Sequence, residues 1–260
     1  MNMTILSVNL NKIALLRNSR EGDEPNIIEA AKIAISNGAK GITVHPRSDQ
    51  RHIRPQDIIV LTEFLREQAQ IEFNIEGNPL AKPNPNGYPG FSHLVCTAKP
   101  EQVTLVPDTE NQLTSDHGWD LTRDNEELAD LILLYKSVGS RISLFMDPDP
   151  EQITLAKKYG ADRIELYTGP FAKTLKEKGI HHKDSRKIFA LYREMATLAN
   201  DLGLGVNAGH DLNTLNLEAF REIDCLLEVS IGHALINDSL TVGLAQAVRM
   251  YVNVLNGDKS

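Results

Sequence analysis

The chain has 260 residues, a formal net charge of −8 and a sequence pI of about 5.5. Its 41% hydrophobic and 24% charged residues suit a globular protein with a sizeable core and exclude a disordered or fibrous chain. The acidic balance argues against a nucleic-acid-binding protein, which usually carries a broad basic face.

The N-terminal stretch and the cysteine content predict the compartment. MNMTILSVNLNK lacks the basic and apolar regions of a signal peptide, and no apolar run approaches the ~18 residues that cross a bilayer. The two cysteines, Cys96 and Cys225, form no CxxC pair and no zinc-site spacing, which fits a reducing environment. We therefore expect a cytoplasmic protein with no membrane partner.

Short apolar runs that are typical of strands recur along the chain. They are TILSVNL (4–10), GITVH (41–45), IEFNIE (71–76), QVTLVP (102–107), RISLFMD (141–147), DRIELYTG (162–169), LGVNAGH (204–210) and LLEVSIGHALI (226–236). Between them, stretches such as PNIIEAAKIAISNG and PEQITLAKKYG have apolar residues at helical spacing, a proline near the start and a glycine at the end. Strands that alternate with helices predict a parallel sheet.

A faint internal repeat supports a closed sheet. AISNGAKGITVH, LAKKYGADRIELY and, more loosely, LANDLGLGVNAGH share a helix end, a turn and a strand. We expect an α/β fold, with residues 1–260 forming a single (β/α)8 TIM barrel domain. The alternative is an open doubly wound sheet, which the absence of GxGxxG or GxxxxGK[ST] after the first strand disfavours. We expect a turn-rich start to 77–98, a long loop at 108–120 and a mobile loop at 170–183.

Polar residues stand at the C-terminal ends of most of the expected strands. The strand ends carry Asn9, Asn11, His45, Arg47, Glu76, Asp147, Glu165, Thr168, His210, Gly232 and His233. Because the active site of a barrel forms at the C-terminal ends of its strands, these residues predict a polar active-site mouth.

The strand at 71–76 points titratable groups inward. Period-2 alternation places its apolar residues on the face that meets the helices, and Glu72, Asn74 and Glu76 on the other face. A buried carboxylate has a raised pKa and makes a good general acid or base. The alternative is a structural hydrogen-bond network, and the sequence leaves both interpretations open.

The stretch GITVHPRSDQRHIR suggests a phosphate site. Arg47 and His52 can converge on a phosphate from one loop, and Arg17 and Arg20 in LLRNSR supply a second cationic point. Glycine-containing NAGHD and SIGHA offer backbone N–H groups for another phosphate. Two anion sites predict phosphorylated small-molecule substrates. His45, Glu72, Asp147, Glu165 and His210 include side chains that can bind zinc or manganese, but they show no local spacing such as HExxH, so we expect no metal. No GxSxG motif indicates a nucleophilic serine.

Taken together and in this order, VNLNKIALLRNSR, GAKGITVHPRSDQRHI, IEFNIEGN, RISLFMD, IELYTG, VNAGHDLN and IGHALI resemble the pyridoxine 5′-phosphate synthase family over essentially the whole chain. The resemblance implies a cofactor-free (β/α)8 enzyme. Its reaction condenses 1-deoxy-D-xylulose 5-phosphate with 3-amino-2-oxopropyl phosphate to pyridoxine 5′-phosphate, phosphate and water. It also implies a homo-oligomer, specifically a homo-octamer. The apolar-rich last helix LAQAVRMYVNVL separately predicts a homo-oligomer of unspecified size.

The resemblance implies a role for individual residues. His45 and Glu72 would accept protons, His210 would donate one, and Glu165 would stabilise developing positive charge. The deoxyxylulose phosphate would be held by Asn11, Lys12, Arg47, His52 and Thr114. The amino-ketone phosphate would be held by Asn9, Arg20, Asp211 through its backbone, Gly232 and His233.

Three residues depart from the family pattern. Asn11 and Lys12 stand where the family often has Asp-His, and Asp211 stands where it often has glycine. Glu72 also lies deeper in its strand than Glu76, so barrel geometry favours Glu76 for the proton-accepting role and the resemblance favours Glu72. Two other functions compete: a metal-dependent sugar-phosphate epimerase or aldolase on the same barrel, and a non-catalytic ligand sensor or scaffold.

Overall fold

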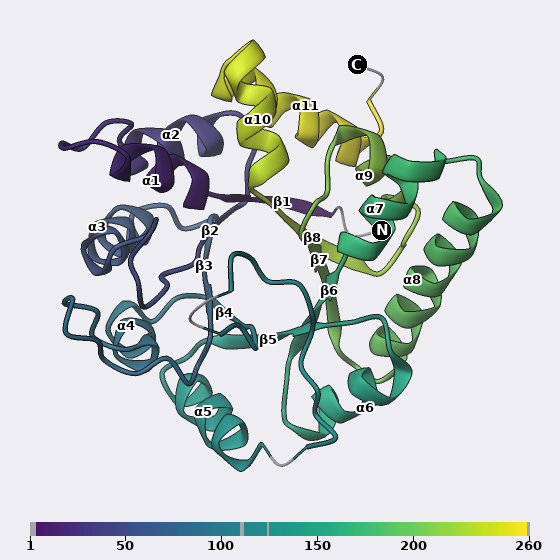
Figure 1. Cartoon of the computed structure of the whole chain (residues 1–260), viewed down its shortest axis with the longest axis horizontal. Helices are drawn as coiled ribbons and strands as arrows, with labels where there is room; N and C mark the ends of the chain where they lie inside the picture. The colour runs from purple at the N-terminus through teal and green to yellow at the C-terminus, as the bar shows by residue number, and fades with distance from the viewer. Residues whose placement is uncertain (1–3, 110–111, 124, 259–260) are drawn as a thin grey trace.

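The computed structural model describes residues 4–109, 112–123 and 125–258. Eight parallel strands close into a barrel in which each strand pairs with the next and β8 pairs with β1. Figure 1 shows the ring of helices around this barrel. The chain is therefore a single (β/α)8 TIM barrel, as the alternation of strands and helices predicts.

The strands agree closely with the apolar runs of the sequence. They are β1 (Ile5–Asn9), β2 (Gly41–Val44), β3 (Glu72–Gly77), β4 (Gln102–Leu105), β5 (Arg141–Met146), β6 (Arg163–Tyr167), β7 (Gly205–Gly209) and β8 (Leu226–Ile231). The expectation for 226–236 was too long at its end. Gly232 ends the extended backbone, and the helix α10 begins at His233.

Eleven helices lie within the described residues. They are α1 (Asn11–Asn18), α2 (Ile27–Ser36), α3 (Pro55–Arg66), α4 (Phe91–Ala98), α5 (Glu126–Ser137), α6 (Pro150–Lys158), α7 (Gly169–Lys178), α8 (Lys183–Asp201), α9 (Thr214–Phe220), α10 (His233–Val242) and α11 (Leu244–Asn256). Gly38 and Gly160 follow α2 and α6 with φ of +105° and +90°, a left-handed backbone that favours glycine. The shared turn of the internal repeat thus has a structural reason.

The prediction of a mobile loop at 170–183 was wrong. Residues 169–178 form the helix α7, with Pro170 in its first turn and lysines in its last turn. Phe171 is fully buried against Tyr192 and Phe220, which anchors the helix to the rest of the fold. The Gly-Pro pair is therefore a helix start.

The two other expected loops are present. Residues 78–90 form turns, with a short bridge between Asn84 and Tyr88, before α4 begins. No helix or strand interrupts the described part of the segment between β4 and α5; residues 110–111 and 124 lie outside the described residues.

The barrel interior is polar, whereas the apolar core lies between the strands and the helices. Ser7, Thr43, Asn74 and Thr104 point inward and form a continuous hydrogen-bonded chain across β1 to β4. The alternating residues, such as Ile42 and Val44, are fully buried on the helix side. Many barrels fill their interior with branched apolar side chains, so this lining is unusual.

The last helix completes the fold of its own subunit. The buried residues of α11 are Ala247, Val248, Tyr251 and Leu255, and the helix packs against α10, α9, α2 and β1. Its apolar stripe is thus used within the chain, so it gives no support to our expectation of a homo-oligomer.

Among the described residues, no helix combines the length and the apolar character needed to cross a bilayer.

Candidate active site

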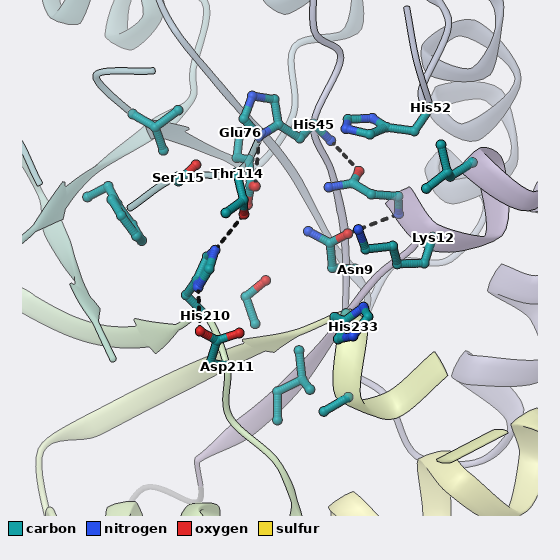
Figure 2. A pocket seen from close by; sticks show the side chains of 18 of the residues that line it. Asn9, Lys12, His45, His52, Glu76, Thr114, Ser115, His210, Asp211 and His233 are labelled. Atoms are coloured by element: carbon teal, nitrogen blue, oxygen red, sulfur yellow. Dashed lines mark hydrogen bonds and ion pairs between the residues drawn. The ribbon is translucent and has the colours of Figure 1, made fainter. Parts of the chain in front are cut away.

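A cavity of about 430 Å³ opens at the C-terminal ends of the strands, which is a size suited to small-molecule ligands. Figure 2 shows side chains from several strand ends converging on it. Of the residues expected at the site, those that line it are Asn9, Asn11, Lys12, His45, Arg47, His52, Thr114, Glu165, His210, Asp211, Gly232 and His233. The sequence thus predicts most of the cavity wall.

Glu72 does not line this cavity. It is the first residue of β3, and its carboxylate accepts hydrogen bonds from Arg141 at the opposite end of the barrel. Glu76, four residues along the same inward face, takes the place at the cavity wall. The structure therefore does not support the proton-accepting role that the resemblance implies for Glu72, because the strand carries this carboxylate to the wrong end.

Arg20 also lies outside the cavity wall. It follows α1 and its side chain is exposed. Arg17, which the sequence suggested as a second cationic point, is buried and forms a two-pronged ion pair with Asp57 (2.5 and 2.9 Å). Arg17 also donates to the backbone carbonyl of His52. It therefore supports the loop that follows β2.

His45 forms a hydrogen-bonded pair with Glu76. The Nδ1 atom of His45 lies 3.0 Å from Oε1 of Glu76, and Figure 2 shows this pair on the cavity wall. Since an ionised carboxylate only accepts hydrogen bonds, Nδ1 of His45 carries the proton. The backbone N–H of His45 donates to Oδ1 of Asn11 (2.8 Å), and Asn9 accepts from the N–H of Asn11, so the first two strand ends are locked together.

Glu76 and Glu165 have pKa values shifted in opposite directions. Burial alone would raise the pKa of Glu76, but the hydrogen bond from His45 and the charges of His45, His210 and Arg47 outweigh it, so its pKa lies below the ordinary value. Burial and the nearby charge of Glu76 raise the pKa of Glu165 well above its ordinary value. The surroundings therefore favour the ionised form of Glu76 and the protonated form of Glu165.

His52 is a neutral hydrogen-bond donor at this site. Burial, assisted by the positive charges of His45, Arg47 and other neighbours, lowers the pKa of His52 to about 2. Its Nδ1 atom accepts the backbone N–H of Ile53 (3.0 Å), so the single ring proton is on Nε2. His52 can therefore offer an N–H group to a phosphate without carrying charge.

Arg47 reaches the cavity but is already bonded there. Its terminal nitrogens donate to Asp108 and to the carbonyl of Gln112, and Asp108 also accepts from Ser115. Lys12 also lines the cavity, and its side-chain ammonium group makes no hydrogen bond or ion pair with another described residue. Lys12 is accordingly the better-placed cation for a ligand phosphate at this side of the mouth.

The described part of the loop after β4 is held closed over the cavity. Besides Arg47, Arg51 donates to the carbonyls of Gln112 and Leu113 (both 3.3 Å). Thr114 then reaches across the mouth, and its Oγ1 atom lies 2.8 Å from Nε2 of His210 (Figure 2). This loop therefore covers part of the cavity.

His210 and Asp211 form a strained turn after β7. Their φ angles are +78° and +58°, which are unfavourable for residues with a side chain. The Oγ1 of Thr168 donates to the carbonyl of His210, and Asn216 donates to the carbonyl of Asp211 (3.0 Å). Nδ1 of His210 lies 3.3 Å from Oδ2 of Asp211 (Figure 2). These partners fix the direction in which the His210 ring enters the cavity.

The start of α10 supplies backbone donors opposite Lys12. Gly232, His233 and Ala234 line the cavity, and no side chain of the described residues caps the first N–H groups of the helix. A helix N-terminus of this kind attracts anions. Gly232 is required for close packing, since a Cβ there would lie 3.1–3.2 Å from the side chain of Asn9.

Residues 6–257 match the family described as pyridoxal phosphate biosynthesis protein PdxJ. Curated relatives include pyridoxine 5′-phosphate synthase of Xanthomonas oryzae pv. oryzae (strain MAFF 311018), 51% identical over 99% of both chains. The protein of that name from Xylella fastidiosa (strain 9a5c) is 50% identical over 97% of this chain and 95% of its own. This chain belongs to the PdxJ family.

More distant solved structures share the fold of this PdxJ family member. One is 3-keto-L-gulonate-6-phosphate decarboxylase from Vibrio cholerae (TM-score 0.62, 8% identity, 100% of both chains covered). Another is a tryptophan synthase alpha-subunit mutant from Pyrococcus furiosus (TM-score 0.61, 12% identity, 98% of both chains covered). At these identities the likeness shows only the barrel.

Some functional residues of this PdxJ family member were missed. Arg51, Ser115 and Phe145 line the cavity, and Asp108 is buried behind Arg47. Arg51 lies in the same basic stretch as Arg47 and His52, so its place at the site could have been predicted from that stretch. No sequence pattern predicts the places of Ser115 and Asp108, because only the path of a long loop brings them to Arg47. Within the described residues, no group of three or more His, Cys, Asp or Glu is placed to hold a metal ion.

Proposed function

We propose that this PdxJ family member is a pyridoxine 5′-phosphate synthase. It condenses 1-deoxy-D-xylulose 5-phosphate with 3-amino-2-oxopropyl phosphate to pyridoxine 5′-phosphate, inorganic phosphate and water. The observation that carries the proposal is that one cavity has two separate edges suited to phosphate, with four acid–base side chains around it: His45, Glu76, Glu165 and His210. A condensation of two phosphorylated reactants needs this combination.

The first edge suits the phosphate of the deoxyxylulose substrate. Lys12 provides the positive charge, and the neutral His52 provides an N–H donor. Asn11, Arg47 and Thr114 complete this side of the cavity. Arg47 positions the loop after β4 through Asp108 and contributes its charge at short range.

The second edge suits the phosphate of the amino-ketone substrate. The backbone N–H groups at the start of α10, at Gly232 and His233, face the cavity together with Asn9. Asp211 contributes through its backbone only, because its carboxylate would repel a phosphate. Arg20 is not part of this edge in the structure.

The residues between the two edges supply the proton transfers. Amine addition to a ketone, loss of water and phosphate, and ring closure each move a proton, which general acids and bases accelerate. His45 accepts a proton and His210 donates one, while Glu165 stabilises developing positive charge by ionising. Holding both reactants in one cavity also lowers the entropic barrier of the condensation.

The loop after β4 keeps water away from the intermediates. Arg47 and Arg51 hold its carbonyl groups, and the bond between Thr114 and His210 links the loop to the opposite wall. Closure of such a loop protects reactive intermediates from hydrolysis. We place the enzyme in the cytoplasm, as a homo-octamer by analogy with the family.

A turnover assay tests the proposal. Purified protein is mixed with both substrates, with and without a metal chelator, and product fluorescence is followed together with phosphate release. We expect both signals at equal rates and no effect of the chelator. Activity that the chelator abolishes favours the metal-dependent sugar-phosphate enzyme. Binding of both ligands without turnover favours the sensor or scaffold.

A further inference from the structure

The turn after β7 brings the side chain of Asp211 back onto the ring of the residue before it. His210 and Asp211 have φ angles of +78° and +58° in succession. Aspartate is one of the few residues with a side chain that adopts this left-handed backbone readily. In this conformation Oδ2 of Asp211 lies 3.3 Å from Nδ1 of His210.

The ring of His210 has one neighbour at each nitrogen. Nε2 lies 2.8 Å from Oγ1 of Thr114, a residue that lines the cavity, whereas Nδ1 faces Asp211 (Figure 2). Nδ1 is shielded from solvent, and no described residue other than Asp211 offers it a polar partner. Within the described part of the chain, Asp211 is therefore the group that can determine whether Nδ1 carries a proton.

The other contacts of His210 hold its ring without selecting a tautomer. The ring packs edge-on against Tyr167, with centroids 5.3 Å apart, and Tyr167 packs against Phe145. Thr168 donates to the carbonyl of His210. The hydroxyl of Thr114 can either donate or accept, so it fits Nε2 with or without a proton. The choice of tautomer therefore depends on Asp211.

Asp211 is suited to be an ionised acceptor. Its polar contact with His210 lowers its pKa, burial opposes this effect, and the positive charges of His210, His233 and Lys176 lower the pKa further. A carboxylate only accepts hydrogen bonds, so Nδ1 of His210 carries a proton beside it. Nε2 is then the ring nitrogen that can gain and lose a proton at the cavity.

The carboxylate of Asp211 is directed away from the edge that suits the phosphate of the amino-ketone. Figure 2 shows it beside His210, whereas His233 at the start of α10 lies apart from it. The side-chain amide of Asn216 holds the backbone carbonyl of Asp211 (3.0 Å). The negative side chain can therefore stand next to a phosphate edge, because it faces the histidine.

We propose that Asp211 is a positioning residue for proton transfer by His210, an inference that rests on the proposed function. Its carboxylate keeps a proton on Nδ1, so that Nε2 is the atom that exchanges a proton with the substrate. In the donating step the Nε2–H bond of the doubly protonated ring breaks, the proton goes to an oxygen of the substrate, and the electron pair stays on Nε2. Nδ1 keeps its proton throughout, and the carboxylate keeps its charge.

Two substitutions of Asp211 in the full-length enzyme test the effect on the rate. Glycine and asparagine both suit a φ of +58°, so Asp211→Gly and Asp211→Asn should remain folded and bind deoxyxylulose phosphate, as thermal unfolding with and without this ligand checks. We expect kcat to fall by about 10–100-fold, a part of the ~10²–10⁴-fold that a general acid supplies, with little change in KM.

A second histidine–aspartate pair provides the matched control. Oδ2 of Asp184 lies 3.7 Å from Nδ1 of His182, and both side chains are about 40% exposed outside the cavity wall. Asp184→Asn should keep the wild-type kcat. A loss of kcat in Asp184→Asn that equals the loss in Asp211→Asn overturns the assignment.

The position of the ring proton separates positioning from a general structural effect. In enzyme labelled with ¹⁵N-histidine, the signals of His210 are those missing in His210→Gln. With the ring neutral, wild type and Asp184→Asn should show a protonated Nδ1 and an unprotonated Nε2. In Asp211→Gly the two nitrogen signals should move toward each other or reverse, because nothing then holds the proton on Nδ1.

The rate and the tautomer must change together. A loss of kcat in Asp211→Gly with an unchanged tautomer overturns the proposal, and so does a changed tautomer with kcat kept. A wild type that binds both substrates but forms no product refutes the proposed function itself. The NMR signals need no turnover, so they still decide in that case whether Asp211 fixes the proton of His210.

Discussion

His52 shows how the surroundings of one residue set its chemistry. Its pKa is lowered to about 2 by burial and by the positive charges around it, and its Nδ1 atom accepts from the backbone of Ile53. We predict that the His52 ring stays neutral, with its proton on Nε2, from pH 5 to pH 8. NMR of the ring nitrogens and Cε1 proton tests this prediction; a titration near the ordinary pKa of ~6.5 would contradict it.

The same shift predicts an acid instability. Below the ordinary histidine pKa of ~6.5, the unfolded chain binds a proton at His52 that the folded chain does not, so the free energy of unfolding falls as pH falls. His52→Gln should therefore weaken the loss of stability between pH 6.5 and pH 4. Urea unfolding at several pH values measures this difference, and parallel pH curves for the two proteins would count against it.

The buried carboxyl group of Glu165 lowers the stability of the folded protein at neutral pH. Its pKa is raised in the folded state, so above pH ~4.5 the unfolded chain releases a proton that the folded chain retains, and the free energy of unfolding falls as pH rises. We predict that Glu165→Gln stabilises the protein by about 1–2 kcal/mol at pH 7, while activity is lost. Differential scanning calorimetry at pH 5 and pH 7 tests this: the gain should be larger at pH 7, and an equal change at both would refute it.

At the scale of the element, β3 shows what the sequence predicts and where it stops. Alternation in IEFNIE correctly places Glu72, Asn74 and Glu76 on the inner face. Whether an inward residue reaches the cavity depends on its depth in the barrel, which the pairing with β2 and β4 sets. Barrel geometry therefore correctly placed Glu76, and not Glu72, at the cavity. The resemblance pointed to Glu72, whose carboxylate is held by Arg141 from β5, and no local pattern shows that contact.

The loop after β2 depends on the ion pair between α1 and α3. Arg17 and Asp57 are both buried, and Asp57 also accepts the N–H of Arg54 (2.7 Å). Asp57→Ala should lower the free energy of unfolding by about 3–5 kcal/mol, because it leaves a buried guanidinium without its partner. It should also raise KM for deoxyxylulose phosphate, since Arg17 supports His52. As a control, Glu29→Gln in the exposed pair with Lys32 should cost no more than about 1 kcal/mol in urea unfolding; equal losses would refute the assignment.

At the scale of the whole molecule, the barrel explains why strand ends were a good guide to the site. Closure of eight parallel strands brings their C-terminal ends to one mouth, so polar residues far apart in the sequence meet there. Contacts made by long loops were not predictable in this way. Arg47 donates a hydrogen bond to Asp108, which lies 61 residues further along the chain. Only the path of the loop after β4 brings the two side chains together.

Exposed leucines on two adjacent helices are relevant to the expected homo-oligomer. The helices α1 and α10 pack together, and Leu16 and Leu240 on them are 53% and 77% exposed. Exposed leucines on adjacent helices are suited to burial against another subunit. We predict a solution mass that is a multiple of 28.9 kDa, reduced in Leu240→Lys, by light scattering after gel filtration. A wild-type monomer would contradict the expectation.

The most direct test of the account is a single-turnover reaction with enzyme in excess over both substrates and no added metal. Quenched samples are analysed for pyridoxine 5′-phosphate and for inorganic phosphate, and each substrate alone serves as the control. The account predicts one phosphate released for each pyridoxine 5′-phosphate formed, and neither product from either substrate alone. Phosphate release without pyridoxine 5′-phosphate, or no reaction while both substrates bind, would contradict the claim that this cavity joins the two substrates into the pyridoxine ring.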